Sequence, residues 1–305
     1  MVSTQFDCLI VGGGPAGLTA AIYAARFRMK VKVIDAGSSR AALIPCTRNQ
    51  SGFPGGISGP DLLDRMRRHA LEFGVCLEEA QVDSVSPVQD GFEAAAAGGV
   101  TRARAVILAT GVSNHRPPID PALHAAALAA GRLRYCPVCD GFEVTDQNVA
   151  VIGSGAHGVR EALFLRSFTE RVTLVAPGDS HELAAAQRLS LREAGVLAVD
   201  GPPGDFELLD EGLALSVGGR REIFEAVYPA LGSSAHNALA IGLGAEVTGE
   251  GCIKVDAHQR TSAPGLYAAG DVVMGLDQIS HAVGEGAVAA TTLRNDLDRV
   301  RPFRR

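Results

Sequence analysis

Two glycine-rich turns, each directly after a short apolar run, constrain this chain more than any other feature. The first is Gly12-Gly13-Gly14-Pro15-Ala16-Gly17, which follows the apolar run Phe6 to Val11 and precedes an alanine-rich stretch, Leu18 to Arg28. An apolar strand, a Gly-x-Gly-x-x-Gly turn and a helix in this order are the fingerprint of a dinucleotide-binding βαβ unit. A second strand, Val31 to Ile34, ends in Asp35, whose carboxylate can accept hydrogen bonds from ribose hydroxyls.

The glycines of the first turn serve different purposes. Gly12 permits the tight turn, Gly14 lets backbone amides approach a pyrophosphate, and Gly17 lets the helix pack closely against the strand. The helix N-terminus favours an anion, because the aligned peptide dipoles leave it partially positive. Strand, turn, helix, second strand and terminal acid together therefore predict a dinucleotide site.

The same order recurs later in the chain. An apolar segment, Asn148 to Ile152, precedes the turn Gly153-Ser154-Gly155-Ala156-His157-Gly158, and a helix through Phe168 and a strand, Val172 to Val175, follow. These glycines are needed for helix and strand to pack whether or not a ligand is bound, so a structural relic stays an alternative. The copy supplies a possible nucleotide loop formed by Gly153, Gly155 and Gly158.

The second copy ends differently from the first. An acid at the end of its strand would bind an NAD ribose, and arginines would bind a 2'-phosphate, but the chain has Ala176-Pro177-Gly178-Asp179 there. Pro177 has no backbone donor, and Asp179 lies past the strand end and would repel a 2'-phosphate. The sequence therefore disfavours NADPH in particular and leaves the use of NAD(P)H open.

Between the two turns lies a Cys-x-x-Cys sequence, Cys136-Pro137-Val138-Cys139, followed by Asp140-Gly141. Two cysteines at this spacing can close a small disulfide that is easily reduced and whose thiolates are kinetically available. A structural zinc site would need a second pair, and the remaining cysteines are scattered singly. We therefore predict a redox-active disulfide and no metal, with a buried inert pair as the alternative.

Composition limits the function classes. The chain has 305 residues, of which 47% are apolar and 20% charged, as is ordinary for a globular protein of two domains. The formal net charge is -6 and the basic residues are dispersed apart from C-terminal arginines, so we predict no nucleic-acid binding. The run Phe6 to Val11 does not have the pattern of a secretion signal, and no run is long enough to span a membrane. Together with cysteines that form no disulfide framework, these features predict a cytoplasmic protein.

Strand and linker signals predict two crossings between domains. Segments around Val82 to Val85 and Phe92 to Ala96, followed by Ala105 to Gly111, indicate strands that return the chain to its first sheet. A linker is predicted at Ser113 to Pro118, and the matching exit lies near Gly232 to Ser234. The fold class is therefore α/β, with two doubly wound, Rossmann-like, three-layer domains, the second inserted in the first. The predicted boundaries are 1–116 and 241–305 for the discontinuous first domain and 117–240 for the inserted domain, which carries the Cys-x-x-Cys sequence.

The order of the motifs resembles that of low-molecular-weight thioredoxin reductases along nearly the whole chain. The likeness is carried by residues 8–17, Ala109-Thr110-Gly111, the Cys-x-x-Cys-Asp-Gly-Phe run, the second glycine turn and the segment Thr261 to Asp271. It implies a flavoprotein with FAD at the first glycine turn and a redox dithiol on the inserted domain. It also implies a homodimer, and a partner that is a thioredoxin-like protein or a small dithiol or disulfide.

Matching positions in the family's pattern imply which residues contact FAD. The chain departs from that pattern at Arg40-Ala41-Ala42-Leu43, where the family has a glycine-glutamine-leucine stretch. The implied contacts are, for the pyrophosphate, Gly12, Gly14, Pro15, Ala16 and Gly17, for the adenosine ribose Asp35, for the adenine Val82, for the ribityl chain Asp271, and for the flavin Asn49, Thr110, Gly111, Gln278 and Ile279.

The resemblance also implies roles at the dithiol. Cys139 would face the flavin and exchange electrons with it, and Cys136 would attack or release the sulfur of the partner. Asp140 can protonate a leaving thiolate if burial raises its pKa toward neutrality, and a helix-capping aspartate is the alternative. His281, at the start of the last predicted helix, is a second candidate acid near the flavin, with a structural or solvated histidine as the alternative.

One departure from the family leaves the electron source open. The family carries a histidine and two arginines after the fourth strand of the inserted domain, where this chain has Ala176-Pro177-Gly178. The first hypothesis is an FAD-dependent disulfide reductase of thioredoxin reductase type, whose donor need not be NADPH. The second is a flavin-dependent dithiol oxidase that passes electrons to oxygen, and the third is a non-catalytic flavin module that senses redox state.

Overall fold

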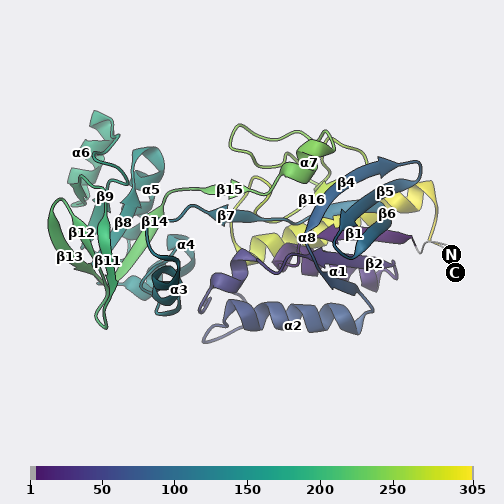
Figure 1. The fold of residues 1–305 in the computed structure, drawn as a ribbon, viewed down its shortest axis with the longest axis horizontal. Helices are drawn as coiled ribbons and strands as arrows, with labels where there is room; N and C mark the ends of the chain where they lie inside the picture. Colours follow the sequence, from purple (N-terminus) through teal and green to yellow (C-terminus); the bar gives the residue numbers. More distant parts are fainter. Residues whose placement is uncertain (1–4, 304–305) are drawn as a thin grey trace. The chain divides into compact units, whose positions relative to one another are not determined.

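The computed structural model describes residues 5–303, which form two compact units (Figure 1). The first unit contains the chain up to Leu43, Ser58–Ser113 and the chain from Ser234 onward. The second unit contains Ile44–Ile57 and Asn114–Ser233. The contacts thus group Ile44–Ile57 with the second unit, whereas the predicted boundaries place this segment in the first domain.

The first unit is built on a sheet with the strand order β3-β2-β1-β6-β5-β4, in which β16 also pairs with β6. In the parallel part, Val11 lies opposite both Ile34 and Leu108, so the carboxyl ends of β1, β2 and β6 lie side by side. This is the edge at which open α/β sheets bind nucleotides. The strands are β1 (Phe6–Val11), β2 (Val31–Asp35), β3 (Cys76–Glu79), β6 (Gly99–Leu108) and β16 (Leu266–Ala268) in the parallel part, and β4 (Val82–Val88) and β5 (Gly91–Ala96) in the antiparallel part.

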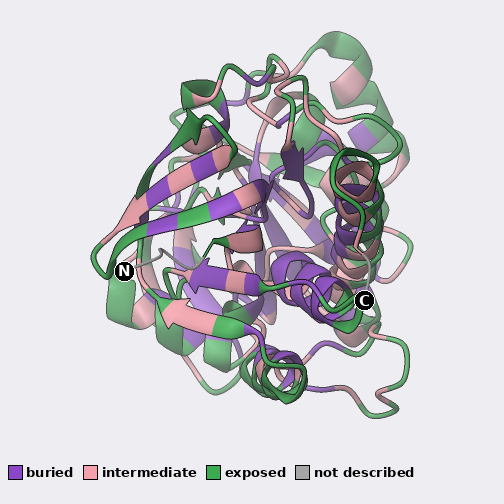
Figure 2. Cartoon of the chain, turned by 90° about the vertical axis from the view of Figure 1, so that its right-hand side faces the viewer, coloured by how far each residue is buried: buried purple, intermediate pink, exposed green. Residues whose placement is uncertain are grey.

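From Cys8 to Val11 the central strand of this sheet is buried on both faces, which explains why these residues are all apolar. Buried strand segments are purple in Figure 2. Cys8 and Ile10 point to one core, which they share with α1 (Pro15–Arg26) and α8 (Ile279–Val300). Leu9 and Val11 point to the opposite core, which they share with β4, β5 and β16. The sheet therefore has covered faces, as a doubly wound fold requires.

The contact between α1 and α8 depends on small residues. The buried face of α1 carries Ala20, Ala21 and Ala24, which let the two helices approach closely. A Cβ at Gly286 of α8 would lie 2.2 Å from the carbonyl oxygen of Ala16. The remaining helices of this unit are η1 (Arg40–Leu43), α2 (Gly59–Glu72) and α7 (Ala238–Gly242).

The second unit contains a parallel sheet with the strand order β10-β9-β8-β14 and an antiparallel sheet with the order β11-β12-β13. Along β8, Val149 and Val151 face the core shared with α5, and Ala150 and Ile152 face the core shared with α3 and the antiparallel sheet. The elements are β8 (Val149–Gly153), β9 (Val172–Val175), β10 (Leu197–Val199), β11 (Gly204–Leu208), β12 (Leu213–Val217), β13 (Arg220–Phe224), β14 (Ala226–Ala230), α3 (Pro121–Ala129), α4 (Pro137–Asp140), η2 (Gly141–Val144), α5 (Gly155–Leu165) and α6 (Ala185–Glu193).

The chain passes between the units along two strands that pair with each other, β7 (Val112–Asn114) and β15 (Ser233–Ala235). Beyond the pair, the His115 amide donates to the Gly232 carbonyl at 2.9 Å. The predicted linker at Ser113 to Pro118 therefore begins as a strand. It does so because the two crossings run beside each other and satisfy each other's backbone groups.

The α/β class with two Rossmann-like domains is confirmed. Both predicted strand–turn–helix units are present, as β1 with α1 and β8 with α5. Among the described residues, no helix combines the length and the apolar character needed to cross a membrane.

Two glycines of α8 provide a test of the helix contact. Gly286→Ala adds a Cβ 2.2 Å from a backbone oxygen of α1, whereas a Cβ at Gly284 would meet no described heavy atom within 4 Å. Alanine is the better helix former by about 1 kcal/mol at either position. We expect Gly284→Ala to raise the free energy of unfolding by up to about that amount, and Gly286→Ala to lower it by about 1–3 kcal/mol through overpacking. Urea unfolding followed by circular dichroism measures both, and equal shifts would contradict the close contact.

Candidate functional site

The first glycine turn is shaped by close approach of backbone to backbone. Gly12 has a φ of +106°, and a Cβ there would lie 2.2 Å from the Ala109 carbonyl oxygen. A Cβ at Gly17 would lie 2.0 Å from the Gly12 carbonyl oxygen. The glycines predicted for the tight turn and for helix packing thus occupy positions that tolerate no side chain.

The end of this turn suits an anion. The N-cap of α1 is Gly14, which has no side chain to satisfy the first helical amides, and Pro15 occupies the first turn. The amides near Ala16 therefore receive no side-chain cap from the described residues. Such an uncapped N-terminus, with a partial positive charge, fits a pyrophosphate.

Asp35 lies at the end of β2, and one of its carboxylate oxygens faces the glycine turn. Its Oδ1 accepts from the Gly13 amide at 2.9 Å, and its Oδ2 pairs with Arg67 Nη2 at 3.2 Å. An ionised carboxylate offers about four lone-pair sites, so capacity remains for ribose hydroxyls. The residues at this edge therefore fit the adenosine pyrophosphate part of FAD.

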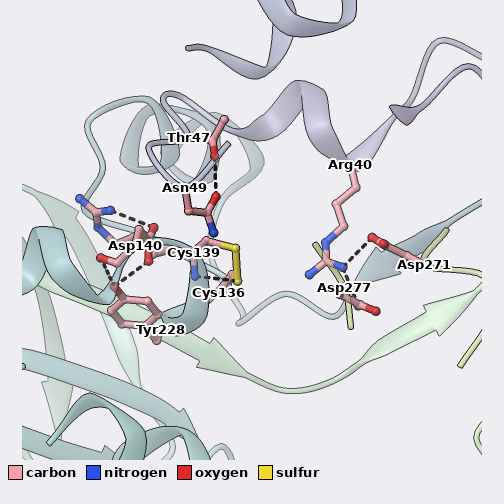
Figure 3. Close-up of a disulfide and its surroundings, with 10 residues drawn as sticks. Arg40, Thr47, Asn49, Cys136, Cys139, Asp140, Tyr228, Asp271 and Asp277 are labelled. Carbon is pink, nitrogen blue, oxygen red and sulfur yellow. Dashed lines mark hydrogen bonds and ion pairs between the residues drawn. A yellow bond between two sulfur atoms is a disulfide. The ribbon is translucent and has the colours of Figure 1, made fainter. Parts of the chain in front are cut away.

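A cluster of acids lies where the chain enters α8. Asp271 pairs with Arg40 at 3.1 Å, and the same guanidinium reaches Asp277 at 2.8 Å (Figure 3). Burial raises the pKa of Asp271, the Asp277 charge raises it further, and Arg40 opposes both. The Arg40 that replaces the family's glycine-glutamine-leucine stretch therefore compensates the acid implied for the ribityl chain.

His281 on α8 is paired with a neighbouring acid. Its Nε2 lies 3.0 Å from Glu285 Oε1, while Glu285 Oε2 accepts from the Gly270 amide at 2.7 Å. Burial raises the pKa of Glu285, and both of these partners oppose the rise. Its pairing with a buried acid supports the structural alternative for this histidine, and its role as a second acid stays a prediction.

The other residues implied for FAD are divided between the units. Val82, Thr110, Gly111, Gln278 and Ile279 lie in the first unit, and Gln278 is the N-cap of α8. Asn49 belongs to the second unit, where its Oδ1 accepts from the Thr47 hydroxyl at 2.9 Å. Figure 3 shows its amide group directed toward the disulfide. A contact between Asn49 and the flavin therefore stays a prediction.

The dithiol is present as a disulfide between Cys136 and Cys139. Cys136 is the N-cap of the short helix α4, and the Cys139 amide donates to the Cys136 carbonyl at 2.9 Å and lies 3.2 Å from its Sγ. An amide hydrogen directed at a sulfur stabilises the thiolate form. Val138 and Phe142, which are 51% and 78% exposed, put apolar surface beside the pair.

Asp140 follows the disulfide and is held by two side chains. Its Oδ2 pairs with Arg134 Nη1 at 2.9 Å, and its Oδ1 accepts from the Tyr228 hydroxyl at 2.9 Å. Burial raises the pKa of the carboxyl, and Arg134 and Tyr228 both oppose the rise. A half-buried acid with a raised pKa next to a dithiol has the properties of a proton carrier.

The second glycine turn has a different environment. The Ser154 hydroxyl accepts from the Glu182 amide at 2.9 Å. His181 Nε2 donates to the Leu174 carbonyl at 3.1 Å, so its Nδ1 is the acceptor for the Ser154 hydroxyl at 3.3 Å. The segment after β9 is thus fastened to the turn, whose glycines are Gly153, Gly155 and Gly158.

Comparison with known proteins decides the family. Residues 6–286 match the family described as pyridine nucleotide-disulphide oxidoreductase. The chain belongs to this family. The oxidoreductase is 33% identical over 303 residues to the thioredoxin reductase of Mycolicibacterium smegmatis, which covers 94% of this chain and 95% of the relative.

Solved structures give the same result. The thioredoxin reductase from Streptococcus pyogenes MGAS5005 has a TM-score of 0.89 at 29% identity, covering 97% of this chain and 99% of that one. A protein described as the atypical thioredoxin reductase TRi from Desulfovibrio vulgaris Hildenborough has a TM-score of 0.56 at 34% identity, covering 98% and 100%. The oxidoreductase is thus a thioredoxin reductase-like flavoprotein of the thiol–disulfide type, which confirms the resemblance.

Sequence reasoning missed the partners of the acids. Arg134 precedes the dithiol by two residues, and a charged side chain so close to a Cys-x-x-Cys sequence was a usable signal. Tyr228 lies 88 residues beyond Asp140 in a wholly buried strand, where a tyrosine reads as ordinary core. Arg40 stands out in the sequence only as part of the segment that departs from the family's pattern, and Glu285 belongs to no motif.

The disulfide can be tested by counting thiols. In the structure, which describes every cysteine, Cys8, Cys46, Cys76 and Cys252 are free and the other two of the six are paired. We expect the unreduced protein, denatured under argon, to titrate with four thiols and the fully reduced protein with six. Six thiols without reductant, from protein purified in air, would contradict the assignment.

Proposed function

We propose that this protein is an FAD-dependent thiol–disulfide oxidoreductase that passes electrons between the flavin and a partner disulfide through Cys136 and Cys139, with a donor other than NADPH. The observation that carries the proposal is the disulfide followed by a half-buried carboxyl group whose two oxygens are both held by hydrogen bonds. Such a pair of groups can exchange sulfur bonds and move the accompanying protons.

The first unit supports FAD as the cofactor. Its glycine turn leaves an uncapped helix N-terminus for the pyrophosphate, and Asp35 keeps lone pairs for the ribose. Asp271, compensated by Arg40, and the Gln278 end of α8 would hold the ribityl chain and the flavin. When bound, FAD supplies an electron pair to the Cys136–Cys139 disulfide or accepts one from the dithiol.

The residues of the second unit divide the sulfur chemistry. Cys136 attacks the partner disulfide, while Cys139 is the sulfur that later displaces the partner from Cys136. Asp140 gives a proton to the departing thiolate and takes one from the Cys139 thiol. Burial raises the pKa of Asp140, so the carboxyl keeps its proton to a higher pH than an exposed aspartate and can deliver it to a thiolate.

Two features support a donor other than NADPH. The positions that would clamp a 2'-phosphate hold Ala176, Pro177 and Gly178, and the hydroxyl of Ser154 is already bonded to the following segment. A 2'-phosphate would therefore find no guanidinium partner at the three clamp positions.

The partner is a thioredoxin-like protein or a small dithiol or disulfide. Exposed Val138 and Phe142 beside the disulfide support a macromolecular or apolar partner, because apolar surface favours association. The homodimer and the cytoplasmic location implied earlier stay predictions.

An anaerobic titration of the yellow holoprotein tests the donor. We expect dithionite to bleach the flavin absorbance fully and NADPH, even in excess, to leave it unchanged, with NADH as a parallel sample. Rapid bleaching by NADPH would contradict the proposed donor. Peroxide formed on adding a small dithiol in air would favour the dithiol oxidase.

Serine variants test the dithiol. Once the flavin is reduced by dithionite, we expect Cys139→Ser to slow electron transfer to a disulfide by at least about a hundredfold. Cys252→Ser, at a free cysteine of the first unit, serves as the matched control and should behave as wild type. Unchanged transfer in Cys139→Ser would refute the proposed function, and absence of transfer in the wild type would favour the redox sensor.

A further inference from the structure

Two side chains hold the Asp140 carboxylate, and one of them, Tyr228, lies 88 residues away in the sequence (Figure 3). Arg134 lies 2.9 Å from Oδ2, and Tyr228 donates to Oδ1 at 2.9 Å. The Arg134 Nε donates to the Gly131 carbonyl at 2.9 Å, which fixes the plane of the guanidinium. Tyr228 is fully buried in β14. Both contacts therefore have little conformational freedom.

Other titratable groups bear on the same carboxylate. Glu143, on η2, raises the pKa of Asp140, and its own Oε1 lies 3.9 Å from Arg48 Nη1. Burial is the largest cause of the raised Asp140 pKa, and Arg134 is the largest opposing one. Burial also raises the pKa of Tyr228, so its hydroxyl stays protonated and donates.

We propose that Arg134 and Tyr228 are positioning residues that favour the ionised form of Asp140, which takes the proton of the Cys139 thiol, and present its carboxylate to the dithiol in one orientation. The inference rests on the proposed function, in which Asp140 carries protons for the Cys136–Cys139 couple. Because each carboxylate oxygen is already bonded on one side, the proton enters and leaves through the lone pairs that remain.

The proton balance shows why the ionised state matters. The Cys136 thiolate attacks a partner sulfur, the partner S–S bond breaks, and the departing thiolate takes the proton of Asp140. The ionised Asp140 then takes the proton of the Cys139 thiol, whose sulfur attacks Cys136 and closes the enzyme disulfide. The bond from Cys136 to the partner breaks, and the second partner thiolate takes its proton from solvent.

The two positioning residues act on the step in which Asp140 takes the proton of the Cys139 thiol. Without the Arg134 charge, burial acts on the carboxyl with less opposition, so a larger share of Asp140 stays protonated and cannot take the proton of the Cys139 thiol. Without the Tyr228 hydroxyl the ionised form loses one hydrogen bond, which shifts the balance the same way but less. A residue that merely fastened α4 to β14 would change thermal stability and leave the pH dependence unmoved.

The test measures sulfur exchange with no electron donor present during the reaction. Holoprotein reduced by dithiothreitol and separated from it under argon is mixed with dithiobis-nitrobenzoate across the acid and neutral pH range. The rate in Cys136→Ser is subtracted to remove the other cysteines. We expect Arg134→Gln to slow exchange about tenfold at neutral pH and to move the acid limb of the profile upward by about one unit. Tyr228→Phe should move it less, and Arg134→Lys should restore most of the rate.

Matched controls keep the same residue types but leave Asp140 untouched. Arg132 bonds to the Glu225 and Asp210 carbonyls, and Tyr135 pairs with His124. Arg132→Gln and Tyr135→Phe should therefore keep the wild-type profile. A shift in these controls as large as in Arg134→Gln would overturn the inference.

A double variant separates action through Asp140 from direct action on the thiols. If Arg134 works through the carboxylate, adding Arg134→Gln to Asp140→Asn should change the rate by less than about twofold. A tenfold further loss in the double variant would overturn the inference and leave the proposed function standing. Unchanged exchange in Cys136→Ser would overturn both.

Discussion

The first unit depends on two close contacts of helix α1, one with the backbone at the end of β1 and one with helix α8. Gly17 sits against the Gly12 carbonyl at the end of β1, and Gly286 of α8 sits against the Ala16 carbonyl. These contacts fix where α1 begins, and so where its uncapped amides point. Because Asp35 ends the neighbouring strand β2, the same geometry places a carboxylate beside those amides through the Gly13 contact. The candidate cofactor site is therefore a consequence of helix packing at glycine.

The two glycine turns show how one backbone pattern supports two outcomes. At the first turn Gly14 leaves the helix N-terminus open. At the second, the N-cap Ser154 gives the helix no side-chain cap either, but its hydroxyl is bonded to the Glu182 amide and the His181 ring. Strand, turn and helix form in both cases, because their packing needs only glycine and apolar residues. What the turn can bind is decided by the side chains around it.

This contrast explains what the sequence could predict. Glycine spacing and apolar runs are local, so β1 with α1 and β8 with α5 followed from them, as did the fold class. The grouping of Ile44–Ile57 with the second unit could not be predicted in this way. That segment has no periodic pattern, and tertiary contacts decide which unit it joins. The role of Tyr228 could not be predicted for the same reason, because its hydroxyl reaches Asp140 only where β14 passes beside α4.

In each unit burial raises the pKa of a half-buried carboxyl group, and one arginine opposes the rise. Arg40 meets Asp271 but shares its charge with Asp277, whereas Arg134 donates to the carboxylate of Asp140 and is fixed by the Gly131 carbonyl. A guanidinium shared between two acids suits a carboxylate that accepts hydrogen bonds and keeps its protonation state. A dedicated one, with the Tyr228 hydroxyl on the other oxygen, suits a carboxylate that must change its protonation state and recover it. The difference between the two pairs thus fits the roles proposed for them, in which Asp271 holds a ligand and Asp140 moves a proton.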